Sequence, residues 1–171
     1  MSHLKRTQLY NVHTAARAAM VDFGGWEMPM EYPAKIVAEH LYTRSHCSLF
    51  DVSHMGRILV DGTDAVPFLQ HVLSSDVSAV AVNQAQYAII PNERGGAVVN
   101  AANTERDLLH LESQIGSFDA RMTVITGDYA AIAVQGPKSD EILQVLTGGE
   151  AATEPRRNAL RSLMFEGRSV H

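Results

Sequence analysis

Cysteine, tryptophan and net positive charge are all scarce in this chain of 171 residues, which has one Cys, one Trp and 14 Lys and Arg against 19 Asp and Glu. Because Cys47 is alone, no intrachain disulfide can form, which excludes a disulfide-stapled scaffold and is typical of a reducing compartment. The sequence around Cys47 identifies no electropositive environment that would activate a thiol, so we interpret it as a small packing residue.

Basic patches and long apolar runs are missing as well. The net charge is −5 and the pI is near 5.9, whereas a nucleic-acid-binding surface usually appears as a basic excess, so we expect no nucleic-acid partner. No run of about 18 apolar residues occurs, and the first residues lead into no apolar run of signal-peptide length. We therefore expect no membrane partner and a cytoplasmic protein.

What is present is an ordinary globular composition, with 46% apolar and 19% charged residues. Hydrophobic periodicity predicts a short helix at the beginning of residues 7–19 and helices over 34–46 and 65–73. A further helix is predicted to begin near Thr104, and another to be opened by Gly136 and Pro137. Strands are predicted over 20–23, 49–61, 87–90, 121–126, 129–134 and 160–165. Helices and strands alternate without a glycine-rich phosphate loop, which predicts an α+β fold with antiparallel sheets and packed helices.

Three of these elements carry predictions about side-chain placement. In the helix over 65–73, an apolar stripe at helical spacing is predicted, formed by Ala65, Phe68, Leu69, Val72 and Leu73. In the helix over 34–46, the residues Ile36, Val37, His40 and Leu41 are expected to form an inward stripe. In the strand over 49–61, Met55 and Arg57 are expected on the less apolar face.

Residues 21–33 place Gly24, Gly25, Trp26 and Pro29 within a few positions. Paired glycines permit backbone dihedrals that other residues rarely adopt, and here they precede a large aromatic ring. The Gly-Gly-Trp stretch at 24–26 is predicted to be a structured loop, and Trp26 is expected to be largely buried with its indole N–H hydrogen-bonded.

Residues 48–56 combine Asp51, Ser53 and His54, the residue types of a catalytic triad. In a regular strand His54 projects away from the other two, so no triad is expected, and we interpret Asp51 as structural. The densest group of metal-ligand types is His40, His46 and Cys47. Six helical positions separate the two histidines by about 240°, so no metal site is predicted.

Met55 is open to two interpretations. Its polarizable thioether, close in sequence to an aromatic and glycine-rich loop, could line a site for a flat heteroaromatic ligand. A methionine at such a position could equally be a core residue, and the pattern alone leaves both open.

Several tracts together resemble, in the same order, the amino-terminal region of the glycine cleavage T-protein, a folate-dependent aminomethyltransferase. They include Asp22–Pro29, Thr43–Met55, Gln84–Tyr87, Asn92–Gly96, Asn100–Leu108 and Val134–Pro137. The resemblance implies transfer of an aminomethyl group from the lipoylated H-protein to tetrahydrofolate, with release of ammonia and formation of methylenetetrahydrofolate. It also implies the amino-terminal domains of a three-domain cloverleaf around a folate channel.

The resemblance assigns two cofactor-binding residues, since Met55 and Tyr87 match positions that line the family's folate pocket. It assigns no catalytic residue. The family has a hairpin with a catalytic aspartate after the glycine turn, whereas here Gly96 is followed by three residues and then Asn100. The chain also ends at His171, before a later family tract that supplies a pterin-binding glutamate. We therefore expect this chain alone to be inactive.

By the same resemblance, residues 1–50 contribute an amino-terminal segment to the first domain, and residues 51–119 form a central folate-binding domain that is incomplete near 96–100. Residues 120–171 then return to the first domain. Two alternatives remain at this stage. One is a folate-binding module or folate-dependent demethylase of the same superfamily, and the other is a non-catalytic fragment that works with a second chain.

Overall fold

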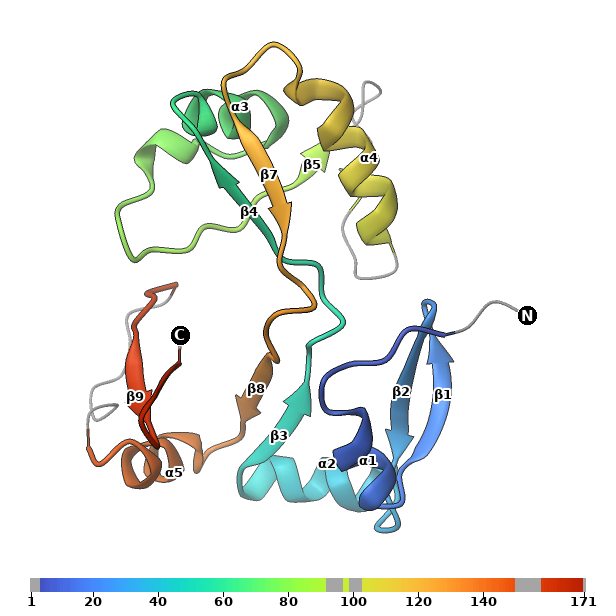
Figure 1. The fold of residues 1–171 in the computed structure, drawn as a ribbon. Coiled ribbons are helices and arrows are strands. Elements are labelled where there is room, and N and C mark those ends of the chain that lie inside the picture. Colours follow the sequence, from blue (N-terminus) through green and yellow to red (C-terminus); the bar gives the residue numbers. More distant parts are fainter. Residues whose placement is uncertain (1–3, 92–96, 99–102, 150–157, 171) are drawn as a thin grey trace. The chain divides into compact units, whose positions relative to one another are not determined.

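A computed structural model describes residues 4–91, 97–98, 103–149 and 158–170 (Figure 1). The chain divides into two compact units, each assembled from separate segments. Unit 1 consists of Met1–Pro33, Asp51–Ala79 and Tyr87–Ala131, and unit 2 of Ala34–Phe50, Val80–Gln86 and Ile132–His171.

The described residues form short helices and short strands. The helices are α1 (Tyr10–Ala15), α2 (Ile36–Ser45), α3 (Ala65–Val72), α4 (Thr104–Ile115) and α5 (Ser139–Leu146), with a 3-10 turn η1 (Val77–Ala79). The strands are β1 (Ala19–Phe23), β2 (Trp26–Glu31), β3 (Ser48–Asp51), β4 (Ile58–Asp61), β5 (Ile90–Pro91), β6 (Ala97–Val98), β7 (Arg121–Val124), β8 (Ile132–Gln135), β9 (Leu163–Phe165) and β10 (Arg168–Val170).

These strands pair two by two. The pairs β1–β2, β4–β7, β5–β6 and β9–β10 are antiparallel, and β3 pairs with β8. The predicted α+β class with antiparallel sheets and packed helices is therefore confirmed. The predicted strands over 121–126 and 129–134 exist in shortened form as β7 and β8, but each pairs with a strand from earlier in the chain.

The glycine pair ends β1 and begins the return of β2. Gly24 and Gly25 have φ angles of 59° and 85°, and Phe23 lies opposite Trp26 in the register. Asp22 Oδ1 accepts a hydrogen bond from Gly25 N at 2.9 Å. Positive φ at both central positions is what a two-residue hairpin turn requires, so the predicted structured loop is a tight hairpin. Trp26 is partly buried, and Lys5 Nζ lies 5.9 Å from the centroid of its ring.

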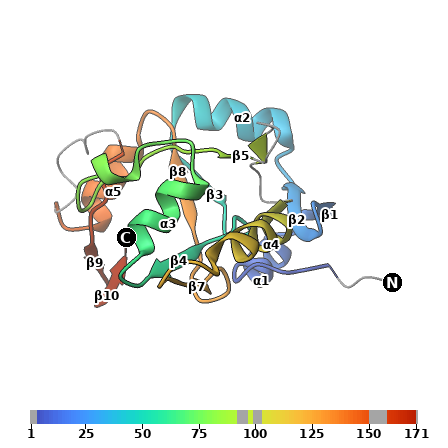
Figure 2. The ribbon, with the colours of Figure 1, turned by 90° about the horizontal axis from the view of Figure 1, so that it is seen from above.

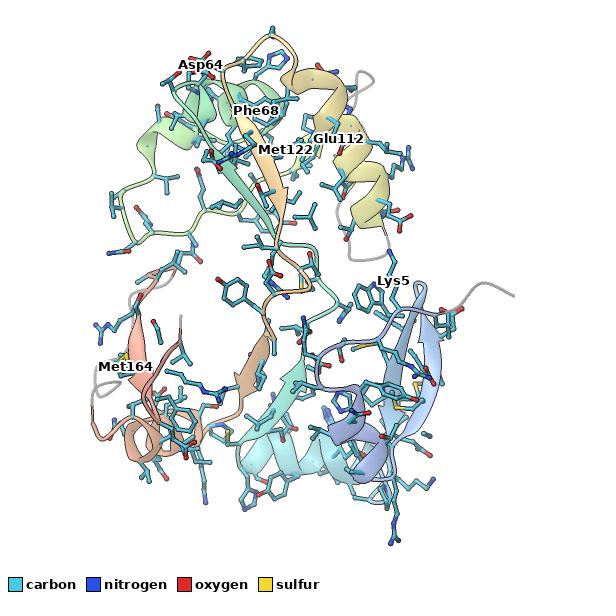
Figure 3. All side chains as sticks on the ribbon, in the orientation of Figure 1. Lys5, Asp64, Phe68, Glu112, Met122 and Met164 are labelled. Carbon is cyan, nitrogen blue, oxygen red and sulfur yellow. The ribbon has the colours of Figure 1, made fainter. Side chains whose placement is uncertain are left out.

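The main hydrophobic core lies in unit 1, between α3, α4 and the β4–β7 pair (Figure 2). Its buried members are Phe68, Val72 and Leu111. Partly buried side chains pack around them, including Leu69, Leu73, Val60, Ile115 and Met122; Figure 3 labels Phe68 and Met122. The helical spacing that predicted a buried stripe on α3 is therefore confirmed.

The stripe predicted on α2 is wrong. Ile36, Val37 and Leu41 are 49%, 71% and 61% exposed. Helical spacing identifies which residues share a face, but burial requires a neighbouring element, and the described part of unit 2 leaves this face uncovered.

Candidate functional site

The segment between β3 and β4 is a turn, so the prediction of one continuous strand over 49–61 is wrong. Val52 N donates to Ala131 O at 2.9 Å, and Met55 N donates back to Val52 O at 3.1 Å. This reversal brings four consecutive residues together and interrupts the period of two that a strand would impose. Met55 and Arg57 therefore do not share a strand face.

One end of this turn is anchored by Asp51, whose carboxylate is 1% exposed. Oδ2 accepts a hydrogen bond from Thr7 Oγ1 at 2.7 Å and lies 2.9 Å from His13 Nε2. Oδ1 accepts from Ser53 N at 2.9 Å. The other ring nitrogen of His13 lies 2.8 Å from the hydroxyl of Tyr32. The result is a buried polar network that ties α1 and the residue after β2 to the start of the turn.

The network sets the ionisation of Asp51. Burial opposes the charged form, but hydrogen bonds from His13, Ser53 and Thr7 outweigh it, so the pKa of the Asp51 carboxyl lies below its ordinary value. The carboxylate has protein donors on both oxygens and almost no exposed surface. This environment agrees with the structural interpretation of Asp51.

The other end of the turn is held by Arg57. Its Nη2 donates to Tyr129 O at 2.6 Å and to Thr126 O at 2.8 Å, while Nη1 donates to Met55 O at 3.2 Å. Its backbone N–H donates to Thr126 Oγ1 at 2.9 Å. The guanidinium therefore bridges the turn and the segment that follows β7.

The two residues predicted to bind folate are both accessible in unit 1. Met55, in the turn, is 50% exposed, and Tyr87 is 76% exposed. The predicted strand over 87–90 is reduced to Ile90–Pro91, so Tyr87 lies in an irregular segment. The backbone carbonyl of Tyr87 accepts a hydrogen bond from Ser75 Oγ at 2.9 Å. Neither residue belongs to the buried core, so the core interpretation of Met55 does not hold.

Asp51, Ser53 and His54 do not form a catalytic triad. His54 packs edge-on against Phe23, with ring centroids 5.7 Å apart, and its buried Nδ1 has no hydrogen-bond partner among the described residues. Ser53 Oγ instead accepts from Ala131 N at 2.9 Å. A regular strand would have pointed His54 away from Asp51 and Ser53. In the structure these residues lie in and beside a turn, and Ser53 bonds to Ala131 and not to His54.

Among the residues that the structure describes, no group of three His, Cys, Asp or Glu is placed to hold a metal ion. His46 is stacked on Tyr42 with ring centroids 4.4 Å apart, and its Nδ1 lies 2.8 Å from Ser45 Oγ.

Within the same described ranges, no helix has the length and apolar character needed to cross a membrane.

Sequence reasoning missed the residues that support the site from a distance. Thr7, His13 and Tyr32 come from three places in the first 32 residues and meet at or beside Asp51. The one available signal was His13, which shares a helical face with the apolar residues Leu9, Val12 and Ala16. The stretch between Gly96 and Asn100, where the resemblance would place a catalytic aspartate, lies mostly outside the described residues; within it the structure describes only β6 (Ala97–Val98).

Comparison with protein families places this geometry in a known context. The model of the GCVT N-terminal domain family matches residues 9–160, which is most of the chain. The chain belongs to this family. The expectation drawn from its sequence tracts is thus confirmed.

Relatives with curated names give the same family. The chain is 42% identical over 168 residues to an aminomethyltransferase of Desulfitobacterium hafniense (strain Y51), covering 89% of this chain and 46% of the relative. It is 38% identical over 181 residues to an aminomethyltransferase of Thermus thermophilus, covering 96% of this chain and 51% of the relative. The chain therefore spans about half the length of the curated relatives that it matches.

A solved structure supports the fold. The glycine cleavage system aminomethyltransferase T from Bartonella henselae matches with a TM-score of 0.78 and 34% sequence identity, over 84% of this chain and 44% of that one. The small antiparallel sheets and packed helices are thus those of an aminomethyltransferase, as the resemblance implied.

Proposed function

We propose that this chain is a folate-binding portion of a tetrahydrofolate-dependent aminomethyltransferase of the glycine cleavage system. The observation that carries the proposal is identity near 40% to relatives named as aminomethyltransferases, over most of this chain. The reaction would release ammonia from the aminomethyl-lipoyl H-protein and form methylenetetrahydrofolate. The lipoylated H-protein is the proposed partner, and the cytoplasm is the proposed compartment.

Met55 and Tyr87 are the proposed pterin contacts. A flat heteroaromatic ring is well matched by a polarizable thioether and by an aromatic face. Both side chains are exposed, as a ligand-contacting residue must be before the ligand binds. Neither side chain is one of the buried residues that pack the hydrophobic core.

The domain roles follow from the same proposal. Residues 51–119 would form the central folate-binding domain, and residues 1–50 and 120–171 would contribute to the first domain. The folded core of α3, α4 and the β4–β7 pair falls within the first of these ranges, apart from the β7 strand.

Titration calorimetry of the purified chain with tetrahydrofolate tests the proposal. Saturable binding is expected, and Tyr87→Ala should weaken it, whereas Tyr42→Ala, at another exposed tyrosine, should not. A second titration uses aminomethylated H-protein. Folate binding without any H-protein binding would favour a folate-binding module or a demethylase of the same superfamily, and absence of folate binding would refute the proposal.

A further inference from the structure

Arg57 makes an unusual set of contacts for a charged side chain. Within the described ranges, its guanidinium donates only to backbone carbonyls: those of Met55 and Ser53 on its own turn, and those of Thr126 and Tyr129 on the segment after β7. No described carboxylate pairs with it. Nη2 lies within hydrogen-bond distance of Ser53 O on the turn and of Thr126 O and Tyr129 O on the other segment, while Nη1 donates to Met55 O. Two nitrogens of the planar guanidinium fork are therefore engaged at once, whereas a lysine ammonium has only one nitrogen.

The backbone reinforces the same junction. Arg57 N donates to Thr126 Oγ1 at 2.9 Å, and Ile125 N donates to Arg57 O at 3.0 Å. At the far end of the turn, Asp51 Oδ1 accepts from Ser53 N. The four residues from Val52 to Met55 are therefore fixed at both ends, by a carboxylate on one side and a guanidinium on the other.

Met55 itself is joined to this arrangement through its backbone. Its N–H donates to Val52 O and its carbonyl accepts from Arg57 Nη1, while its side chain is half exposed. Thus the direction in which the thioether points depends on the turn, and the turn is closed by Arg57. Removing the fork would free the Met55 carbonyl without disturbing the core around Phe68, in which Arg57 has no part.

We propose that Arg57 is a positioning residue, which clamps the Met55 turn to the Thr126–Tyr129 segment and so presents the thioether to the pterin of tetrahydrofolate. This inference rests on the proposed function for its ligand, but the clamp itself can be tested without any ligand. The essential feature is that Nη1 holds the Met55 carbonyl while Nη2 holds the Thr126 and Tyr129 carbonyls, and a positive charge on a single nitrogen does not supply both.

The test compares Arg57→Lys and Arg57→Met with Arg121→Lys, a control at an exposed arginine on β7 that pairs with Asp61. The first measurement is amide hydrogen exchange of the unliganded chain. Both Arg57 variants should exchange faster at residues 53–57 and 126–131, with α3 unchanged, and the control should behave as the wild type. Unchanged protection of both segments in the Arg57 variants would overturn the clamp.

The second measurement is the affinity for tetrahydrofolate, alongside urea unfolding of each variant. Losing charge-assisted hydrogen bonds that orient a contact residue should weaken binding about tenfold. Arg57→Lys should lose nearly as much as Arg57→Met, because lysine keeps the charge and loses the fork. Wild-type affinity in Arg57→Lys would overturn the positioning role, and so would unchanged affinity in both variants.

These outcomes separate the two proposals. If the wild-type chain fails to bind tetrahydrofolate, the proposed function fails, and hydrogen exchange still decides whether Arg57 clamps the turn. If Arg57→Met does not fold, the more conservative Arg57→Lys supplies both readouts.

Discussion

His13 Nε2 lies 2.9 Å from Asp51 Oδ2, although 38 residues separate them in the chain, and both side chains are almost completely buried. Thr7 and Ser53 complete the hydrogen bonding of the same carboxylate. A buried carboxylate is tolerated when such partners surround it, and removing it leaves buried donors without acceptors.

Asp51→Asn should therefore lower the free energy of unfolding by about 3 kcal/mol near neutral pH. Because the pKa of Asp51 is lowered in the folded chain, its ionised form stabilises the fold above the ordinary carboxyl pKa. That contribution is lost as the pH falls through the folded-state value. The difference between wild type and variant should accordingly shrink as the pH is lowered below the ordinary carboxyl pKa of about 4, as measured by urea unfolding.

The exposed Asp128 provides the control for this series. Asp128→Asn should change the unfolding free energy by less than about 0.5 kcal/mol. A pH-independent gap between wild type and Asp51→Asn would show that the effect comes from shape and not from the charge.

Trp26→Ala should cost about 2 kcal/mol of stability. This is less than a fully buried tryptophan would cost, because the ring is only partly buried at the start of β2. Guanidinium unfolding followed by circular dichroism measures the effect. A denaturant midpoint equal to that of the wild type would show that the β1–β2 hairpin does not contribute to the cooperative unfolding of the chain.

Gly62→Ala should destabilise unit 1 strongly. Gly62 has a φ of 125°, and an added Cβ would lie 2.9 Å from Ala120 Cα and closer still to Asp119 O. Both neighbours are backbone atoms that cannot rotate away, so a cost of about 2 kcal/mol or more is expected. Gly116→Ala is the matched control, since a Cβ there meets nothing within 4 Å. Equal melting temperatures for the two variants would contradict the steric argument.

Met55→Ala should weaken tetrahydrofolate binding by about 1 kcal/mol through lost contact area. Met30→Ala is the control, because Met30 is also exposed and lies in unit 1 on β2. Calorimetric titration measures both variants. Unchanged affinity in Met55→Ala would remove this residue from the site.

This chain by itself should not catalyse aminomethyl transfer. The reaction needs a group near the folate that can manage a proton as the carbon arrives, and residues 97–102 contain no carboxylate. Asp107 is no substitute, because it lies within α4, several residues beyond the stretch in which the resemblance would place the aspartate. A single-turnover assay with aminomethylated H-protein and tetrahydrofolate should release no ammonia above the rate without protein. Release well above that background would require another base in the described turn, with His54 examined first.

Hydrophobic periodicity was a reliable guide where an element packs against neighbours close by in the fold. The stripe on α3 predicted Phe68 and Val72 correctly, and the glycine pair predicted the special backbone at residues 24 and 25. On α2 the same reasoning failed, because a stripe records which residues share a face and carries no information about the element that covers it.

The sequence by itself determined the family, the α+β class and the turn at Gly24 and Gly25, because motifs, periodicity and glycine dihedrals are properties of short segments. Only the tertiary structure decided that residues 49–61 form two strands with a turn between them, since the hydrogen bond from Val52 N to Ala131 O crosses 79 positions of the sequence. It also decided that Asp51 meets His13 and that Arg57 meets Tyr129. Such pairings depend on the path of the whole chain, and no local pattern of residue types encodes that path.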